Sequence, residues 1–108
     1  MSSSTSFSLS VPLEHVFKAL GHRVRLQIVR ELIAGDRCVC ELVELSGLGW
    51  SSVSRHLSVL RNAGVLGEEK RGAKVFYHLR MQNVANFIRY MEDPEFRQRA
   101  DAFVASLR

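Results

Sequence analysis

Two short amphipathic stretches separated by only three residues constrain the fold more than any other feature of this sequence. The first stretch ends at Gly47 and the second lies between Gly49 and Gly64, so that the segment "GLG" joins them. Their apolar residues recur at helical spacing and are Val39, Leu42 and Val43 in the first stretch and Val53, Leu57 and Leu60 in the second. Two helices joined by a tight link that contains glycine are typical of a helix-turn-helix. The sequence therefore predicts a helix-turn-helix over residues 38–63.

The apolar pattern changes from helical to alternating after this unit. The segment "VLGEEKRGAKVFYHL" has β-rich ends on either side of the polar turn "KRGAK". On its second arm, Val75, Tyr77 and Leu79 would face one side and Phe76 and His78 the other. Alternation around a short polar turn is typical of a β-hairpin. Residues 65–80 are therefore expected to form a wing with a basic tip.

Helical spacing also marks the segments before and after the wing unit. Residues 11–20 are expected to form one helix, with Pro12 in its first turn, and a second helix is expected from Arg23 to Ala34. Towards the C-terminus, helical spacing returns at Val84, Phe87, Ile88 and Met91, and Asp93 followed by Pro94 predicts the start of a last helix. The predicted fold class is mainly α with a small β-hairpin, a winged helix-turn-helix with additional N- and C-terminal helices in one domain, residues 11–108.

The chain is short for such a fold. A domain of 108 residues buries only about 60 to 70% of its unfolded surface, which favours a homodimer. The apolar faces of residues 11–20 and 81–108 exceed what a minimal winged helix needs, so we interpret these segments as dimerisation helices. Packing of these faces within a single chain is the alternative.

The N-terminus and the apolar runs bear on where the protein acts. No apolar run approaches the roughly 18 to 20 residues that a membrane span needs. The segment "MSSSTSFSLS", residues 1–10, lacks the basic start and apolar core of a secretory signal and is expected to be a disordered leader. The sequence thus favours a cytoplasmic protein with no membrane partner.

The net charge of +4 is confined to one segment of the chain. Residues 1–50 and 81–108 are each balanced, whereas residues 51–80 hold six basic side chains and two acidic ones. These are Arg55, Arg61, Lys70, Arg71, Lys74 and Arg80, and Glu68 and Glu69. A basic segment between neutral flanks favours a polyanion as the binding partner.

Cys38 and Cys40 lie where the first helix of the helix-turn-helix begins. A bond between them would close a very small ring, so a structural disulfide is not expected. On a regular helix the two side chains would point about 200° apart, so both bind one ion only if the first turn is irregular. The helix dipole and Arg37 would favour the thiolate forms, which select soft ions. Two half-buried apolar residues, or a redox switch, are the alternatives.

Three segments together resemble the ArsR/SmtB-type metal-sensing repressors. They are "FKALGHRVRLQIVREL", "CVCELVELSGLGWSSVSRHLSVLRNAGVL" and "KRGAKVFYHL", and the resemblance covers roughly residues 13–80. Its most specific part is "SSVSRHLSVLRNAGVL". The resemblance implies a dimeric bacterial repressor that binds a palindromic DNA operator and is released when a metal or metalloid ion binds.

The segment "CVCEL" resembles the cysteine pair by which arsenic-sensing members of that family bind trivalent arsenic. The resemblance implies Cys38 and Cys40 as ligands, and trivalent arsenic, or antimony by the same chemistry, as inducer. A third cysteine that such members often have falls here on Val43, so a third ligand would come from a small thiol or from solvent. Zinc is not expected, because the four histidines are scattered and the C-terminal helices contain none.

If the second helix of the pair is the recognition helix, its N-terminal residues face the major groove. The candidates for base contacts are Ser51, Ser52, Ser54 and Arg55, and the candidates for the minor groove or backbone are Lys70, Arg71 and Lys74 at the wing tip. Arg55 suits a bidentate bond to guanine, or else a phosphate. Trp50 would either contact DNA or fold back into the core, and His56 is expected to be a hydrogen-bonded structural residue.

Ion binding at the cysteines is expected to distort the start of the first helix and tilt the recognition helix, with a coupling of about 1 to 3 kcal/mol. The competing function is a protein-interaction winged helix in which the cysteines are incidental. The confinement of the net charge to residues 51–80 favours DNA. No histidine adjoins the cysteines, and no acid-base or nucleotide-binding motif is present, so an enzyme is not expected.

Overall fold

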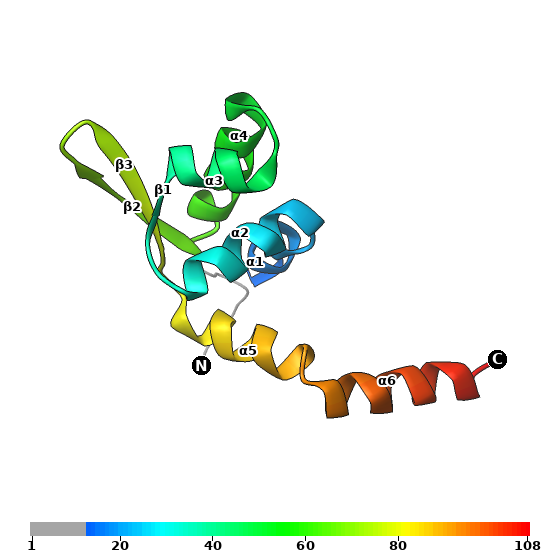
Figure 1. The fold of residues 1–108 in the computed structure, drawn as a ribbon. Coiled ribbons are helices and arrows are strands. Elements are labelled where there is room, and N and C mark those ends of the chain that lie inside the picture. The colour runs from blue at the N-terminus through cyan, green and yellow to red at the C-terminus, as the bar shows by residue number, and fades with distance from the viewer. Residues whose placement is uncertain (1–12) are drawn as a thin grey trace, which may run out of the picture.

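The structure of the chain is a computed structural model that describes residues 13–108, so the predicted leader and the helix start at Pro12 lie outside the described residues. The elements follow in the order α1 Leu13–Leu20, α2 Arg23–Ile33, β1 Arg37–Cys38, α3 Val39–Ser46, α4 Trp50–Asn62, β2 Leu66–Arg71, β3 Lys74–Leu79, α5 Gln82–Met91 and α6 Pro94–Ser106. Helices α1 to α4 lie together against the base of the sheet, and the β2–β3 hairpin projects beyond them (Figure 1).

Helices α3 and α4 form the predicted helix-turn-helix. Helix α3 ends because Gly47 adopts the left-handed conformation, with φ of 70°, that a residue without Cβ reaches at little cost. Gly49 is the extended residue that precedes α4. Val53, Leu57 and Leu60, the stripe that predicted α4, are all completely buried. They belong to one core with buried residues of α1, α2 and the sheet, which fixes α4 on the body of the domain.

The sheet has three strands, whereas the sequence predicted a two-stranded hairpin. The hairpin of β2 and β3 is present and turns at Gly72, where φ is 62°. In addition, β1 pairs with β3 in antiparallel orientation, which gives the order β1-β3-β2. A strand as short as β1 carries no alternating pattern of its own and forms only by pairing with a distant segment, so the prediction missed it.

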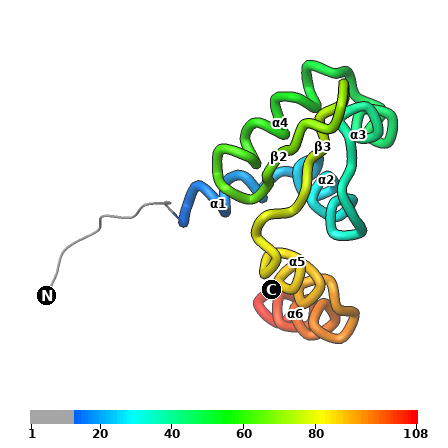
Figure 2. The backbone as a smooth tube through the Cα atoms, turned by 90° about the vertical axis from the view of Figure 1, so that its left-hand side faces the viewer, coloured from blue at the N-terminus to red at the C-terminus, as the bar shows by residue number. Residues whose placement is uncertain are grey.

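The C-terminal helices lie apart from the helix-turn-helix. Asp93 caps α6 as predicted, because its Oδ1 accepts hydrogen bonds from the backbone N–H groups of Glu95 and Phe96 at 2.9 and 3.2 Å, with Pro94 in the first turn. Helix α6 contains no buried residue and extends from α5 away from the body of the domain (Figure 1). Figure 2 shows α5 and α6 together below the other helices and the sheet. None of the helices in residues 13–108 is long and apolar enough to span a membrane.

Candidate nucleic-acid interface and cysteine pair

The N-terminal end of α4 presents the predicted base-contacting residues at the surface. Ser51, Ser54 and Arg55 are exposed, and Ser52 is partly exposed. Trp50 begins α4, outside the buried stripe of that helix, and 57% of its surface is accessible. The alternative that Trp50 folds back into the core is therefore wrong.

The wing tip presents Lys70, Arg71 and Lys74 together. All three are exposed, and Arg71 pairs with Lys74 at the end of the β2–β3 ladder. Within residues 13–108, neither lysine has a carboxylate in ion-pair contact, and the same holds for Arg55. Lys70, Lys74 and Arg55 are therefore uncompensated cations on the side that is predicted to face DNA.

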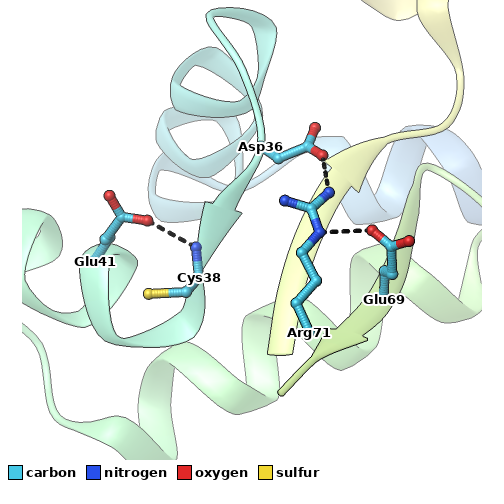
Figure 3. A network of polar contacts seen from close by, with 5 residues as sticks. All are labelled: Asp36, Cys38, Glu41, Glu69 and Arg71. Carbon is cyan, nitrogen blue, oxygen red and sulfur yellow. Dashed lines mark hydrogen bonds and ion pairs between the residues drawn. The ribbon is translucent and has the colours of Figure 1, made fainter. Parts of the chain in front are cut away.

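Arg71, unlike Lys70 and Lys74, forms ion pairs with two carboxylates. Its Nη2 donates to Oδ2 of Asp36 at 2.7 Å, and its Nε donates to Oε1 of Glu69 at 2.7 Å (Figure 3). The hydrogen bond that Arg71 donates to Glu69, and then the one that it donates to Asp36, raise the pKa of Arg71. The guanidinium carbon also lies 4.5 Å from the centroid of the Phe76 ring. Much of the charge of Arg71 is thus balanced within the chain, which reduces what it can offer to a phosphate.

The structure joins Cys38 and Cys40 as a disulfide, with their Cα atoms 5.4 Å apart. The expectation that no such bond forms was wrong. Cys38 is not a helical residue; it ends β1 and precedes α3 with extended backbone angles, φ −79° and ψ 160°. The chain therefore bends between the two residues, and the helical offset of about 200° does not apply. The irregular start that joint binding of one ion requires is present.

The surroundings of the pair are unequal. Cys38 is buried, with 3% of its surface accessible, whereas Cys40 is exposed. The backbone N–H of Cys38 donates to Oε1 of Glu41 at 2.9 Å (Figure 3). Arg37, expected to favour a thiolate, lies 3.6 Å from both Glu31 and Glu41. Its charge is therefore largely balanced by carboxylates, so Arg37 contributes less to thiolate formation than the sequence indicated.

A cavity of about 280 Å³ links the cysteines to both elements that are predicted to face DNA. It is lined by Cys38, Val39, Cys40, Trp50, Ala73, Lys74 and Val75. The indole of the recognition helix and the lysine of the wing thus share one hollow with the disulfide. This juxtaposition was not predictable from the sequence, because it requires the β1–β3 pairing, which brings the cysteines beside the wing, in addition to the packing of α3 against α4.

His56 is hydrogen-bonded and partly buried, as predicted. Its Nδ1 lies 3.2 Å from Nη1 of Arg25, and its ring centroid lies 4.6 Å from that of His22. Burial, and then the charges of His22, Arg25 and Arg55, lower the pKa of His56. No signal in the sequence indicated that Arg25 of α2 would reach the recognition helix.

Residues 13–108 contain no group of three or more histidine, cysteine or acidic side chains that could hold a metal ion. The part of the chain that the structure describes therefore supplies two adjacent sulfur atoms and no third donor beside them.

A helix-turn-helix whose second helix is exposed at its start, flanked by a basic β-hairpin, defines a winged helix-turn-helix, a class of DNA-binding domain. The family model for the arsR family of bacterial regulatory proteins matches residues 22–67. The arsenical resistance operon repressor of Bacillus subtilis is 38% identical over 72 residues, which span 66% of this chain and 69% of that protein. The chain belongs to the ArsR family of bacterial regulatory proteins. The family resemblance and the predicted fold class, apart from the third strand, are thereby confirmed.

Two further matches agree with this assignment. The arsenic resistance transcriptional regulator ArsR1 of Pseudomonas putida is 43% identical over 68 residues, which span 59% of this chain and 51% of that protein. The homodimeric winged helix-turn-helix DNA-binding domain Mb0332 of Mycobacterium bovis, a possible ArsR-family regulator, matches with a TM-score of 0.69 and 26% identity over 74% of each chain. The chain spans about half the length of the first curated relatives that it matches. The family and these relatives are transcriptional regulators rather than enzymes.

Proposed function

We propose that the chain is a DNA-binding transcriptional repressor that acts in the cytoplasm as a homodimer. The observation that carries the proposal is the set of uncompensated cations, Arg55 at the start of α4 and Lys70 and Lys74 on the wing. Two cationic elements beside an exposed recognition helix suit the major groove and the adjacent backbone. A double-stranded operator is therefore the proposed partner.

Dimerisation is supported by the apolar residues that remain exposed on the N- and C-terminal helices. On α1 and α5, Leu13, Phe17 and Phe87 are 62%, 56% and 48% exposed and line one open hollow of about 620 Å³. Phe103 of α6 and Leu107, the residue that follows α6, are 64% and 69% exposed. Monomeric proteins rarely leave apolar patches of this kind open. The proposed dimer covers them and places two recognition helices on successive half-sites.

We further propose that trivalent arsenic, or antimony by the same chemistry, releases the dimer from DNA. The reduced thiols of Cys38 and Cys40 would replace two hydroxyl groups of arsenous acid, each of which leaves as water. The adjacent sulfurs fit such an ion, which thiolates bind preferentially. The third arsenic ligand would be the remaining hydroxyl or a small thiol, because the described residues offer none beside the pair.

The proposed route of release runs through the sheet and the shared cavity. Cys38 pairs with Phe76 of β3, and both cysteines line the cavity that Trp50 and Lys74 also line. A change of bonding at the sulfurs would therefore shift the wing strand and the start of α4 together. Coupling of this kind is typically about 1 to 3 kcal/mol.

The disulfide favours a second candidate, a redox-responsive repressor. In it, reduction of the Cys38–Cys40 bond by a cellular dithiol takes up two electrons and two protons and yields two thiols, and the reductant becomes a disulfide. The DNA affinity of the protein, measured after reduction and again after addition of arsenite, distinguishes the two candidates. DNA affinity that changes on reduction alone favours the redox candidate, whereas affinity that changes only when arsenite is added to the reduced protein favours the metalloid candidate.

DNA recognition is tested with duplexes of operator and scrambled sequence and two variants. Arg55→Ala should relax the preference between the duplexes, because it removes a base contact. Lys70→Ala should weaken binding to both duplexes and lower the salt dependence, because it removes an uncompensated cation of the wing that would contact the DNA backbone. Equal losses on every sequence in both variants would contradict the assignment of Arg55, and absence of any duplex binding would favour the protein-interaction alternative.

A further inference from the structure

A further hollow, lined by cationic side chains, lies between α2 and α4, away from the wing; we refer to it as the α2–α4 hollow. It encloses about 180 Å³ and is lined by Arg25, Ser52, Arg55, His56 and Val59. Ser52, Arg55, His56 and Val59 follow one another along a single face of α4, at helical spacing. Arg25 reaches this face from α2, so the hollow combines the recognition helix with a helix outside the helix-turn-helix pair.

Hydrogen bonds hold Arg25 in place. Its Nε donates to the carbonyl of Ala19 at 2.6 Å, its Nη2 donates to the carbonyl of Lys18 at 3.3 Å, and its Nη1 lies 3.2 Å from Nδ1 of His56. A guanidinium only donates hydrogen bonds, so Nδ1 of His56 must accept, and the ring proton lies on Nε2. The hollow is therefore lined by a fixed guanidinium, by an imidazole with a donor nitrogen, and by a serine hydroxyl.

No carboxylate balances these cations among residues 13–108. The groups that face His56 are His22 and Arg25 from the α2 side and Arg55 from α4 itself. Helix α1 adds only His15 and Lys18, which line the neighbouring hollow shared with Arg25 and Val59. Neither Arg25 nor Arg55 takes part in an ion pair within the described residues. Fixed donors and unbalanced positive charge around a small hollow suit an oxyanion.

We propose that this hollow is a binding site for a phosphate oxyanion and that a backbone phosphate of the bound DNA fills it. The inference rests on the proposed DNA-binding function; it adds Arg25 and His56 to the proposed DNA-facing surface and assigns Ser52, predicted above to contact a base, to a phosphate instead. The phosphate contacts these donors while the start of α4 lies in the major groove. Arg25 thereby anchors α2 on the DNA and sets the orientation of the recognition helix.

A pair of substitutions at Val59 tests the site without removing any of its hydrogen bonds. Val59 is 39% exposed and lines the hollow. Val59→Glu places a carboxylate beside Arg25 and Arg55 in competition with the phosphate, and Val59→Gln is the uncharged control of equal size. Ser58→Glu adds the same charge at the neighbouring position of α4, which lines neither this hollow nor the adjoining one, and controls for general repulsion of DNA.

The first measurement is binding to a duplex at several salt concentrations. The second follows the NMR signals of the His56 ring during a titration with inorganic phosphate, with chloride at equal ionic strength as the control. We expect Val59→Glu to bind the duplex on the order of tenfold more weakly than Val59→Gln, the loss typical of a charge-assisted hydrogen bond. The slope of log affinity against log salt should fall by about 0.9 for each DNA phosphate that the protein no longer neutralises. The His56 signals should shift saturably with phosphate in the wild type and in Val59→Gln, and not in Val59→Glu.

Equal salt slopes in the two Val59 variants, or a loss in Ser58→Glu as large as in Val59→Glu, would overturn the DNA occupancy of the hollow. Absence of a phosphate effect on His56 would overturn the oxyanion site itself. A wild-type chain that binds no duplex would instead refute the proposed function, and a saturable phosphate shift at His56 would then still support the oxyanion site.

Discussion

Cys38 is the antiparallel partner of Phe76, so the cysteine pair is attached directly to the inner strand of the wing. The Phe76 ring in turn lies beneath the guanidinium of Arg71 at the wing tip. The sulfurs are therefore separated from the wing residues that are proposed to face DNA by one cross-strand pair. Under the proposed function, a change of bonding at the sulfurs would reach the wing through this pair of residues, without movement of the whole domain.

Reduction of the disulfide should increase the fluorescence of Trp50. Trp50 is the one tryptophan of the chain and lines the same cavity as Cys38 and Cys40. A disulfide near an indole quenches its emission, and this quenching ends when the bond is reduced. The measurement is the emission spectrum before and after addition of a non-fluorescent dithiol. The Cys38→Ser/Cys40→Ser variant should not respond, and an equal rise in that variant would show that Trp50 does not sense the pair.

Lys74→Ala should lower DNA affinity on every sequence, because Lys74 is an unpaired cation at the wing tip. The salt slope should also fall by about 0.9 for each phosphate that Lys74 neutralises in the wild type. Arg108→Ala, at the C-terminal end, removes the same charge far from the wing along the chain and serves as the control. Anisotropy titrations at several salt concentrations measure both. A slope unchanged in Lys74→Ala would remove this residue from the interface.

The wing should lose stability on acidification. Hydrogen bonds from Arg61 first and then Tyr77 hold the pKa of Glu68 below its ordinary value of 4.5. Because the folded-state pKa is the lower one, the ionised carboxylate stabilises the fold above the ordinary value, and this contribution disappears as the pH falls through the lowered value. We expect the urea midpoint to fall as the pH drops below 4.5, and to fall less in Glu68→Gln than in the control Glu14→Gln. Equal acid sensitivity in the two variants would refute this role of Glu68.

The helices of this domain were predictable because local patterns determine them. Gly47 and Gly49 mark the ends of adjacent helices, and Asp93 with Pro94 marks the start of α6, through interactions that involve only a few neighbouring residues. The residue types at the start of α4 and at the hairpin tip likewise identified the candidate interface.

The features that the sequence did not reveal all depend on contacts between distant segments. The pairing of Cys38 with Phe76 creates β1 and bends the chain, which brings the two sulfurs together. Asp36 reaches Arg71 only because of that pairing, and Arg25 reaches His56 only once α2 packs on α4. Spacing along the chain does not encode such contacts. The disulfide, the balanced charge of Arg71 and the hollow between α2 and α4 are therefore visible only in the structure.

Phe17→Glu should convert the dimer into a monomer. The side chain is 56% exposed on α1 within one chain, so the charge costs little in the isolated fold, whereas it would be buried at the proposed interface. Phe17→Leu keeps an apolar side chain and should leave the dimer intact. Sedimentation velocity distinguishes the two states, and a wild-type chain that is monomeric at all accessible concentrations would contradict the proposed dimer.

The most direct test of the proposed function is the anisotropy of a fluorescent duplex from the region upstream of the coding sequence, bound by reduced protein and titrated with arsenite. Zinc serves as the control ion, and Cys38→Ser and Cys40→Ser as the control variants. We expect arsenite to weaken binding of the wild type by roughly 5- to 150-fold, zinc to leave it bound, and both variants to stay bound in arsenite. Reduced wild type that stays bound in arsenite, or serine variants that are released as readily as the wild type, would contradict the proposal that this cysteine pair controls DNA binding.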